Sequence, residues 1–440
     1  MSSTAWRCAV GLVLLLALVA RLSAVFWLKS WDYPLPGPSR QLAQSLLEYG
    51  ALYYRDWSYF GPSSVLSPVY PTLLAGLFAI FGVENPTAYF AALATNAVLG
   101  AAAAATAIAL LRRLTDRPGP ALAAGALVAI WPPQVVAAAC VQPIALTAWV
   151  VLLGCLMWHR LMQQGTTLSS LNFAIAAALA VLLMPAMLLA AVLALGALLI
   201  QPARSLDVRL RDVSLLLAAM ALLVWPWVAR NRVVHEKWLL TTAFWQQVWA
   251  GANPNATGSD RLPLTPERRA AATQFRPDDE PAGEAVRIPM MQVDLLDAAR
   301  RSALRGQREV QREALFRQWT IEYVAQNPWR WLGQLPIRLL KTWFIDWDHP
   351  LSRHPLAMFP RAALSVVALA GAVALGWRGA PMVAACVAIL AWAGLSAASV
   401  KQTIIMEPLQ ITLAVAGLAM LQGRRREQTI VAPARTGVES

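Results

Sequence analysis

The chain has 440 residues, of which 58% are hydrophobic and only 14% are charged, and its mean hydropathy is +0.50. Because soluble domains carry about 25% charged residues, this composition excludes an ordinary soluble enzyme and indicates an integral membrane protein. The net charge of +13 is concentrated in short segments beside apolar runs. That pattern is typical of topology signals and of contact with membrane lipids, not of nucleic-acid binding.

Several apolar runs reach the length of about 20 residues that a membrane span needs. They are 8–28, 87–111, 118–138, 142–160, 213–229, 359–376, 380–398 and 403–421. The first has no small-residue cleavage site, so we expect a retained helix and not a removed signal peptide. A further run, 171–200, has Pro185 in its middle and fits either one tilted helix or a pair of short ones.

Positive charge decides between these two alternatives. The basic clusters are Arg112, Arg113 and Arg117; His159 and Arg160; Arg204, Arg209 and Arg211; and Arg424, Arg425 and Arg426. They share one side of the membrane only if 171–200 crosses twice. We therefore predict an all-α polytopic membrane protein with about ten transmembrane helices and additional external helices. Both termini are expected in the cytoplasm, at a bacterial inner membrane.

This topology predicts four parts of the chain. They are an N-terminal membrane module at 1–230 with a first external loop at 29–86, an external region at 231–355, C-terminal transmembrane helices at 356–422, and a cytoplasmic tail at 423–440. In the first loop, 67–81 is short for a span and is expected along the outer surface, with a short span as the alternative. In the external region, helical spacing over 291–325 predicts an amphipathic helix that ends before Asn327-Pro328, and 335–347 is expected at the interface.

Asp32, directly after the first span, is the sharpest candidate for chemistry. A carboxylate at that depth is awkward to desolvate and needs a functional reason. Among Trp31, Tyr33 and Pro34, we expect it to be partly desolvated, with a raised proton affinity. It could then take a proton from an incoming hydroxyl as a general base. The alternative is a solvated carboxylate at a helix end. For Asp56, a pair with Arg55 or a solvated side chain is favoured over a catalytic role.

Basic residues near the outer interface form the second group of candidates. They are Arg230, Arg232, Arg338, Lys341 and Lys401. Each could bind a phosphodiester, or could instead extend from a helix end to lipid headgroups. For Asp346 and Asp348 beside His349, a solvated turn is favoured over a cation site.

Other site types are not indicated. The cysteines Cys8, Cys140, Cys155 and Cys386 stand in apolar stretches at unrelated spacings, which indicates neither a disulfide framework nor a metal site. No Walker loop, GxGxxG or GxSxG pattern occurs, so we expect no nucleotide site, no serine triad and no cofactor.

Four stretches together resemble a known family. Asp32 follows the first span; residues 68–82 read PVYPTLLAGLFAIFG; residues 226–231 read PWVARN and are followed by GANPNATG at 251–258; and Asn327-Pro328 precedes a run through Lys341 to Phe344. This order of elements resembles the polytopic GT-C glycosyltransferases, bacterial relatives of the dolichyl-phosphate-mannose protein mannosyltransferases.

The resemblance implies an inverting sugar transfer from a polyprenyl-phosphate donor at the periplasmic face. It implies Asp32 as the catalytic acid of the first external loop and basic residues that hold the lipid phosphate. The implied substrate-binding residues are Tyr70, Arg230, Asn231, Arg338, Lys341 and Lys401. Polyprenyl phosphate is already a good leaving group, so no metal is required. The acceptor, whether glycan, lipid or protein, stays open.

Two other functions remain as alternatives. A flippase or permease for a lipid-linked or polysaccharide intermediate predicts polar residues along a path at mid-membrane and inverted halves. The spans are rich in Ala and Leu with few charges and no visible repeat, which favours surface chemistry. A non-catalytic scaffold predicts that Asp32 and the basic residues do not converge.

Overall fold

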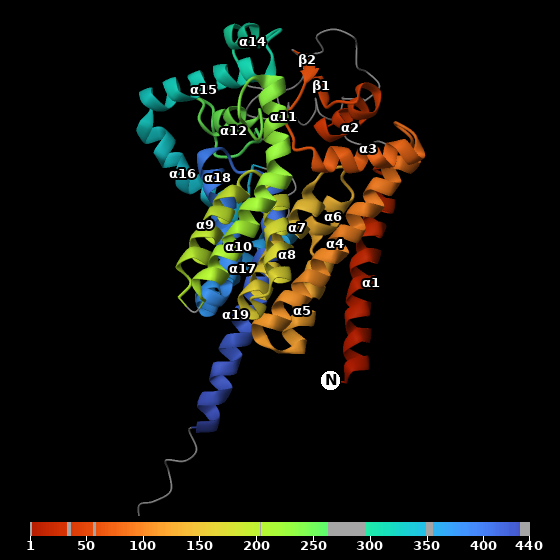
Figure 1. Ribbon diagram of the computed structural model, residues 1–440, viewed down its shortest axis with the longest axis vertical. Coiled ribbons are helices and arrows are strands. Elements are labelled where there is room, and N and C mark those ends of the chain that lie inside the picture. The colour runs from red at the N-terminus through yellow and green to blue at the C-terminus, as the bar shows by residue number, and fades with distance from the viewer. Residues whose placement is uncertain are drawn as a thin grey trace, which may run out of the picture.

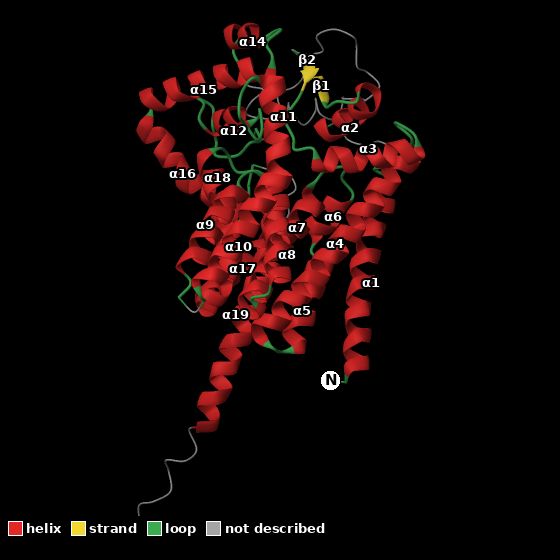
Figure 2. Ribbon diagram, viewed as in Figure 1, coloured by secondary structure: helices red, strands yellow, loops and turns green. Residues whose placement is uncertain are grey.

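The computed structural model describes residues 2–32, 37–55, 59–202, 204–262, 296–348 and 355–431, and within the last range it describes side chains over 358–423. In these ranges the regular elements are helices, apart from one antiparallel hairpin, in which β1 (Tyr53–Arg55) pairs with β2 (Phe60–Pro62) (Figure 2), and an isolated β-bridge between Ser259 and Ala398. The expectation of an all-α polytopic membrane protein is confirmed.

Long helices form a bundle along the length of the molecule, and shorter helices gather at one end of it (Figure 1). The bundle contains α1 (Ser3–Leu28), α4 (Pro86–Thr115), α5 (Pro118–Ile130), α6 (Pro132–Ala138), α7 (Ile144–Gln164), α8 (Thr167–Leu183), α9 (Met187–Ile200), α10 (Leu206–Ala219), α11 (Trp225–His235), α17 (Pro355–Leu375), α18 (Ala380–Leu395) and α19 (Val400–Val431). The π-helical turn η1 (Met220–Val224) joins α10 to α11.

We call the end with the shorter helices the cap end. It contains α2 (Pro38–Tyr49), α3 (Val69–Phe81), α12 (Phe244–Gly251), α14 (Ala298–Leu304), α15 (Glu309–Gln326) and α16 (Pro328–Trp343). The opposite end, which we call the arginine end, holds Arg113 and Arg204. Arg113 donates to the Gln163 side chain and Arg204 donates to the Leu161 carbonyl, both near the end of α7.

Within the described ranges, six continuous helical stretches are long and apolar enough to cross a membrane, and the bent pair α5–α6 makes a seventh. The stretch that contains α17 and α18 changes direction at Gly376, whose φ is +51°, as the contacts of the two helices show. The Ser365 hydroxyl of α17 donates to the carbonyl of Trp343, and Arg338 donates to the carbonyl of Gly394 in α18. Both helices therefore meet α16 at the cap end, and the two spans predicted here are separate helices.

The run 171–200 forms two helices, α8 and α9, and not one. They separate at Pro185, whose ring removes the amide donor that the Val181 carbonyl would need. After α9, the Arg211 guanidinium donates to the carbonyl of Gly165, just before α8, at 2.6 Å. The chain has thus returned to the arginine end, so the pair crosses twice, as the basic clusters predict. With 14 residues, α9 is only about 21 Å long.

The external segments also agree in outline with their predictions. α3 lies across the end of α4 and packs against α2 (Figure 1), which fits a surface helix. The predicted amphipathic segment contains two helices, α14 and α15, on either side of Gly306 (φ +70°); its first residues, 291–295, lie outside the described residues. Phe316 of α15 packs against Trp249 of α12, and α15 ends at Gln326, before Pro328.

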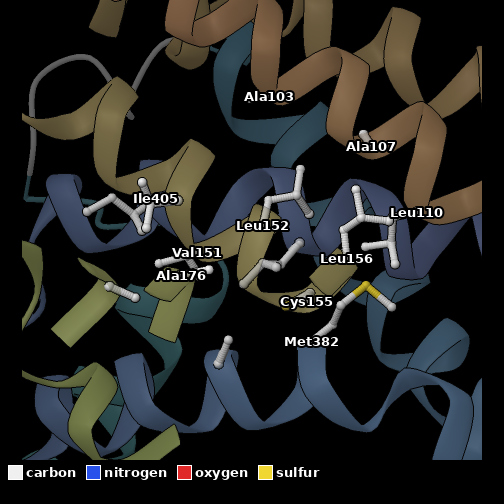
Figure 3. Close-up of a cluster of buried hydrophobic side chains, with 14 of the residues drawn as sticks. Ala103, Ala107, Leu110, Val151, Leu152, Cys155, Leu156, Ala176, Met382 and Ile405 are labelled. Carbon is white, nitrogen blue, oxygen red and sulfur yellow. The ribbon is translucent and has the colours of Figure 1, made fainter. Parts of the chain in front are cut away.

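Small side chains allow the bundle helices to approach closely. The main core joins Ala103, Ala107 and Leu110 of α4 to Val151, Leu152, Cys155 and Leu156 of α7, Ala176 of α8, Met382 of α18 and Ile405 of α19 (Figure 3). At the crossing of α17 and α19, a Cβ built on Gly417 would lie 2.2 Å from the Cα of Gly371. Any larger residue at either position would push these two helices apart.

A buried arginine supplies the missing hydrogen bonds at the bend between α5 and α6, where the helix axis turns by 53°. Pro132 and Pro133 cannot donate to the carbonyls of Val128 and Ala129 one turn earlier. Arg21 of α1 donates to both carbonyls instead, at 3.0 and 2.9 Å. In a membrane such carbonyls must be satisfied by a neighbouring helix, so Arg21 fixes α1 to this break.

Candidate active site

Asp32 lies in the turn that ends α1 at the cap end. Lys29 ends the helix with a left-handed conformation (φ +46°), and the Asp32 amide donates to the Lys29 carbonyl at 3.0 Å. The Asp32 side chain is exposed. The partial desolvation expected from the sequence therefore stays a prediction. Tyr33 and Pro34, which that expectation placed around the carboxylate, lie outside the described residues.

Trp31 fixes the position of this turn. Its ring lies edge-on to Phe26 and Phe90, with centroid separations of 5.6 and 5.8 Å. It packs on a buried cluster that includes Ala139, and Val141 packs on the same cluster. Ala139 and Val141 belong to the turn between α6 and α7, so the first external loop begins beside that turn.

Lys401, in the first turn of α19, approaches the same α6–α7 turn. Its ammonium interacts electrostatically with the Cys140 thiol and with the Asp260 carboxylate. The residue nevertheless keeps an exposed face. Among the residues that the structure describes, no hydrogen bond to this ammonium is seen. Lys401 is thus a cation beside the α6–α7 turn that can still accept an anionic ligand.

Tyr70 lies beneath the α6–α7 turn and is buried, with 1% of its surface exposed. The Asn96 amide donates to the Tyr70 hydroxyl at 3.2 Å and to the Cys140 carbonyl at 2.9 Å. Tyr70 therefore supports the residues that separate Asp32 from Lys401.

Arg338 and Lys341 are buried in α16, with at most 1% of each exposed. Arg338 donates to the carbonyls of Gly394 and Gly251, and burial lowers the pKa of Arg338 to about 10. Lys341 donates to the Thr257 carbonyl at 2.7 Å and to a carboxylate at 2.5 Å. Both cations thus bind the 251–258 patch to α16. This structural role differs from the two roles expected from the sequence, which were phosphate binding and extension to lipid headgroups.

The carboxylate that Lys341 contacts is Asp348, and it is not in a solvated turn. Asp348 and Asp346 are 7% and 1% exposed, so that interpretation of the sequence was wrong. Asp346 accepts from the Ser259 hydroxyl at 2.7 Å. Burial raises the pKa of Asp346 to about 6, the nearby Asp260 carboxylate adds to the rise, and Ser259 and Lys341 oppose it. His349 lies outside the described residues.

We call the buried charged residues Arg338, Lys341, Asp346 and Asp348 the wall. Asp260 lies between this wall and Lys401 and interacts electrostatically with both. Its amide donates to the Ala398 carbonyl at 2.8 Å, and only 8% of the residue is exposed. Burial raises the pKa of the Asp260 carboxyl, while Ser399, Arg261 and Lys401 lower it. Sequence reasoning missed Asp260; its only signal was a short polar run directly after the 251–258 patch.

Arg230 and Asn231 belong to a second network, between α11 and the first external loop. Arg230 donates to the Ser63 carbonyl at 2.9 Å and to the Ser64 hydroxyl at 2.7 Å, and that hydroxyl donates to Asn231 at 2.6 Å. The Ser64 amide donates to Glu309 of α15 at 3.0 Å, and burial raises the pKa of Glu309. This network ties the loop before α3 to the external region.

Glu407 and Arg361 form a buried ion pair between two of the spans. Glu407 of α19 is fully buried and accepts from Arg361 of α17 and, at 3.1 Å, from Gln134 of α6. Gln134 also donates to the carbonyl of Ile404, which Pro408 leaves without a helical donor. These groups hold three helices together next to the α6–α7 turn.

In the described part of the chain, no group of three His, Cys, Asp or Glu side chains is placed to hold a metal ion. Tyr70 is linked to the α6–α7 turn through Asn96, and Lys401 interacts electrostatically with Cys140 of that turn and with Asp260. Asp260 in turn interacts electrostatically with Asp346, while Trp31, next to Asp32, packs on the cluster beside the same turn. Arg230 and Asn231 form their own set around Ser64.

Comparison with known proteins gives no matching family model and no matching curated protein by sequence. Solved structures do match. The apo oligosaccharyltransferase of Archaeoglobus fulgidus gives a TM-score of 0.54 at 13% identity over 100% of this chain and 53% of its own. The oligosaccharyltransferase AglB of the same organism, in complex with an inhibitory peptide and a dolichol-phosphate, gives 0.52 at 12% identity over 99% and 52%.

The chain has the GT-C fold. This confirms the fold that the four sequence stretches imply. The chain spans about half the length of the oligosaccharyltransferase chains that it matches. At 12–13% identity the similarity concerns the fold alone, because one fold supports many activities. The function must therefore be argued from the site.

Proposed function

We propose that the chain is a membrane glycosyltransferase that moves a sugar from a polyprenyl-phosphate donor to an acceptor at the cap end. The observation that carries this proposal is the placement of an exposed carboxylate, Asp32, and an exposed cation, Lys401, beside one turn between α6 and α7. The AglB structure with a dolichol-phosphate supports a lipid phosphate as the donor group. By the positive-inside rule, the arginine end is cytoplasmic and the cap end periplasmic, in a bacterial inner membrane.

In the proposed step, an acceptor oxygen or nitrogen forms a bond to the anomeric carbon of the donor sugar. The bond from that carbon to the phosphate oxygen breaks, and its electron pair leaves with polyprenyl phosphate. Asp32 takes the acceptor's proton as a general base. Displacement from the face opposite the leaving group inverts the anomeric centre.

Lys401 stabilises the leaving phosphate in this proposal, because it is an exposed residue whose ammonium holds no hydrogen bond among the described residues and can supply donors to phosphate oxygens. Arg338 and Lys341, whose donors are occupied by carbonyls and Asp348, hold the wall that positions Asp260 and α19. Asp32 is exposed in the free protein, so the bound lipid and sugar supply the desolvation that raises its proton affinity.

The test is Asp32→Asn in proteoliposomes given a labelled polyprenyl-phosphate sugar together with membrane extract as the acceptor source. Loss of a general base lowers the rate by about 10²–10⁴-fold. Glu48→Gln is the matched control, since Glu48 is an exposed acid of the same loop on α2, and we expect it to retain the wild-type rate. Transfer by Asp32→Asn at the wild-type rate contradicts the proposed role. Movement of the intact donor across the membrane without sugar transfer would instead support the permease alternative.

A further inference from the structure

An apolar cavity of about 470 Å³ opens between α7, α8, α9 and α18, away from the candidate active site. Small residues form much of its lining, including Gly154, Ala177, Gly196 and Ala384. A Cβ built on Gly154 or Gly196 would meet no atom within 4 Å, so these positions leave space that the protein does not fill. The volume is within the range of about 300–1,000 Å³ that is typical of small-molecule sites.

A second cavity, of about 530 Å³, lies at the arginine end. Its polar lining comes from Arg113, Thr115, Asp116, His159, Gln163 and Arg378. The two cavities share two residues, Trp158 and Trp377. The apolar cavity inside the membrane region therefore adjoins the polar cavity at the arginine end, which we call the polar pocket.

The polar pocket contains donors that the protein leaves open. The Arg378 side chain is exposed and, among the described residues, makes no hydrogen bond or ion pair. The imidazole of His159 bonds to the backbone of Arg378, and its buried Nε2 atom, a donor or an acceptor according to the tautomer, has no hydrogen-bond partner in the same residues. Arg113 uses one nitrogen for Gln163, at 2.7 Å. The acid of the pocket, Asp116, is 3.8 Å from the Arg112 guanidinium, which offsets its charge.

We propose that these two cavities form one binding site for an anionic phospholipid of the leaflet at the arginine end. One acyl chain lies in the apolar cavity, and the phosphate lies against Arg378 and Arg113. Charge complementarity selects an anionic headgroup, because the pocket's arginines outnumber its single, paired acid. Trp377 is 91% exposed, a position at which tryptophan sits in the headgroup layer.

The site is separate from that of the proposed sugar donor. The donor's phosphate would lie at the cap end, next to Lys401, whereas Arg113 and Arg378 lie at the other end of the bundle. The lipid would instead fill the space beside α9, which is short for a span and is packed against α18 on one side. A bound lipid therefore stabilises the contact between α9 and α18.

The test measures lipid retained by the purified protein in native mass spectrometry after exchange into detergent with phosphatidylglycerol or phosphatidylcholine. Wild-type protein retains phosphatidylglycerol preferentially. Arg378→Gln lowers that retention about tenfold, as expected for one lost charge-assisted contact, and leaves phosphatidylcholine unchanged. The matched control is Arg7→Gln, which removes an exposed arginine of α1 that does not line either cavity.

Gly154→Leu tests the acyl chain independently of the headgroup. The leucine side chain fills the apolar cavity, so retention of both lipids falls. Arg378 is exposed and Gly154 has open space beside it, so both variants are expected to fold, as thermal unfolding without added lipid checks. Equal retention of the two lipids by wild type, an Arg7→Gln loss as large as that of Arg378→Gln, or wild-type retention by Gly154→Leu would each overturn the proposal.

Discussion

Two lysines at the cap end illustrate how differently one residue type is used. Lys341 is 1% exposed and binds the Thr257 carbonyl and Asp348. Lys401 has an exposed face and, within the described ranges, only electrostatic neighbours such as Asp260 and Cys140. The first lysine stabilises a wall, whereas the second can meet a ligand. Residue type alone does not separate structural cations from binding cations; the number of donors already occupied does.

The largest effect is expected at the wall. Lys341→Met removes one partner of a buried ion pair and leaves Asp348 without its cation, which costs about 3–5 kcal/mol in the free energy of unfolding. Denaturant unfolding in detergent, followed by tryptophan fluorescence, measures the loss.

The double variant Lys341→Met with Asp348→Asn is the control for this pair. It removes both charges, so it should recover a large part of the lost stability, because the remaining buried charge is gone. A single Lys341→Met variant as stable as wild type would show that the wall does not depend on this contact.

A smaller effect is expected from the pH dependence of the same wall. The pKa of Asp346 is raised from 3.8 to about 6 in the folded protein. Between pH 4 and pH 6, roughly, the carboxyl is therefore protonated in the folded state and ionised in the unfolded state. Stability therefore falls as pH rises from about 4 to about 6, by roughly 3 kcal/mol for this group.

Asp346→Asn removes the titrating group while keeping an acceptor for Ser259. The variant should flatten the fall in stability over that pH range, as thermal unfolding at several pH values would show. Asp260 lies close by, and its pKa is also raised, so a residual slope of the same sign is expected. A slope as steep as that of wild type would contradict the assignment to Asp346.

The sequence was sufficient to predict the topology because hydrophobicity and positive charge act locally. The arginines around Arg204 predicted that 171–200 crosses twice, and the interaction of Arg211 with Gly165 agrees. Likewise, the short apolar segment predicted to lie along the surface became α3, which packs against α2 and the end of α4. Such features depend on the bilayer thickness and on charge, which are the same for every membrane protein.

Long-range partners could not be predicted, and the site depends on them. Arg338 can be buried because it donates to the carbonyls of Gly251 and Gly394. These two residues are 87 and 56 positions away from it in the sequence. Asp346 and Asp348 were assigned to a solvated turn because their partners, Ser259 and Lys341, are not apparent from local sequence. The position of each charge therefore follows from the packing of α16 and not from its own neighbours.

Prolines provided a signal that was present but not used. A proline inside a span leaves a carbonyl without a donor one turn earlier, and in a membrane another helix must supply that donor. Arg21 donates to the carbonyls that Pro132 and Pro133 leave without a donor, and Gln134 does the same for the carbonyl one turn before Pro408. A search for polar residues on other spans at matching depth would have linked α1 to α5, and α6 to α19.

The smallest effect is expected at Lys401, and it should be confined to binding. Lys401→Gln removes a cation that holds no hydrogen bond within the described residues, so the unfolding midpoint should stay close to that of wild type. If the ammonium contacts the donor phosphate, KM for the polyprenyl-phosphate sugar rises about tenfold, because one charge-assisted contact is lost. Lys401→Arg keeps the charge and should recover most of the affinity. A Lys401→Gln variant with an unchanged KM would place the phosphate elsewhere, while one that lost stability as Lys341→Met does would mean that both lysines belong to the wall.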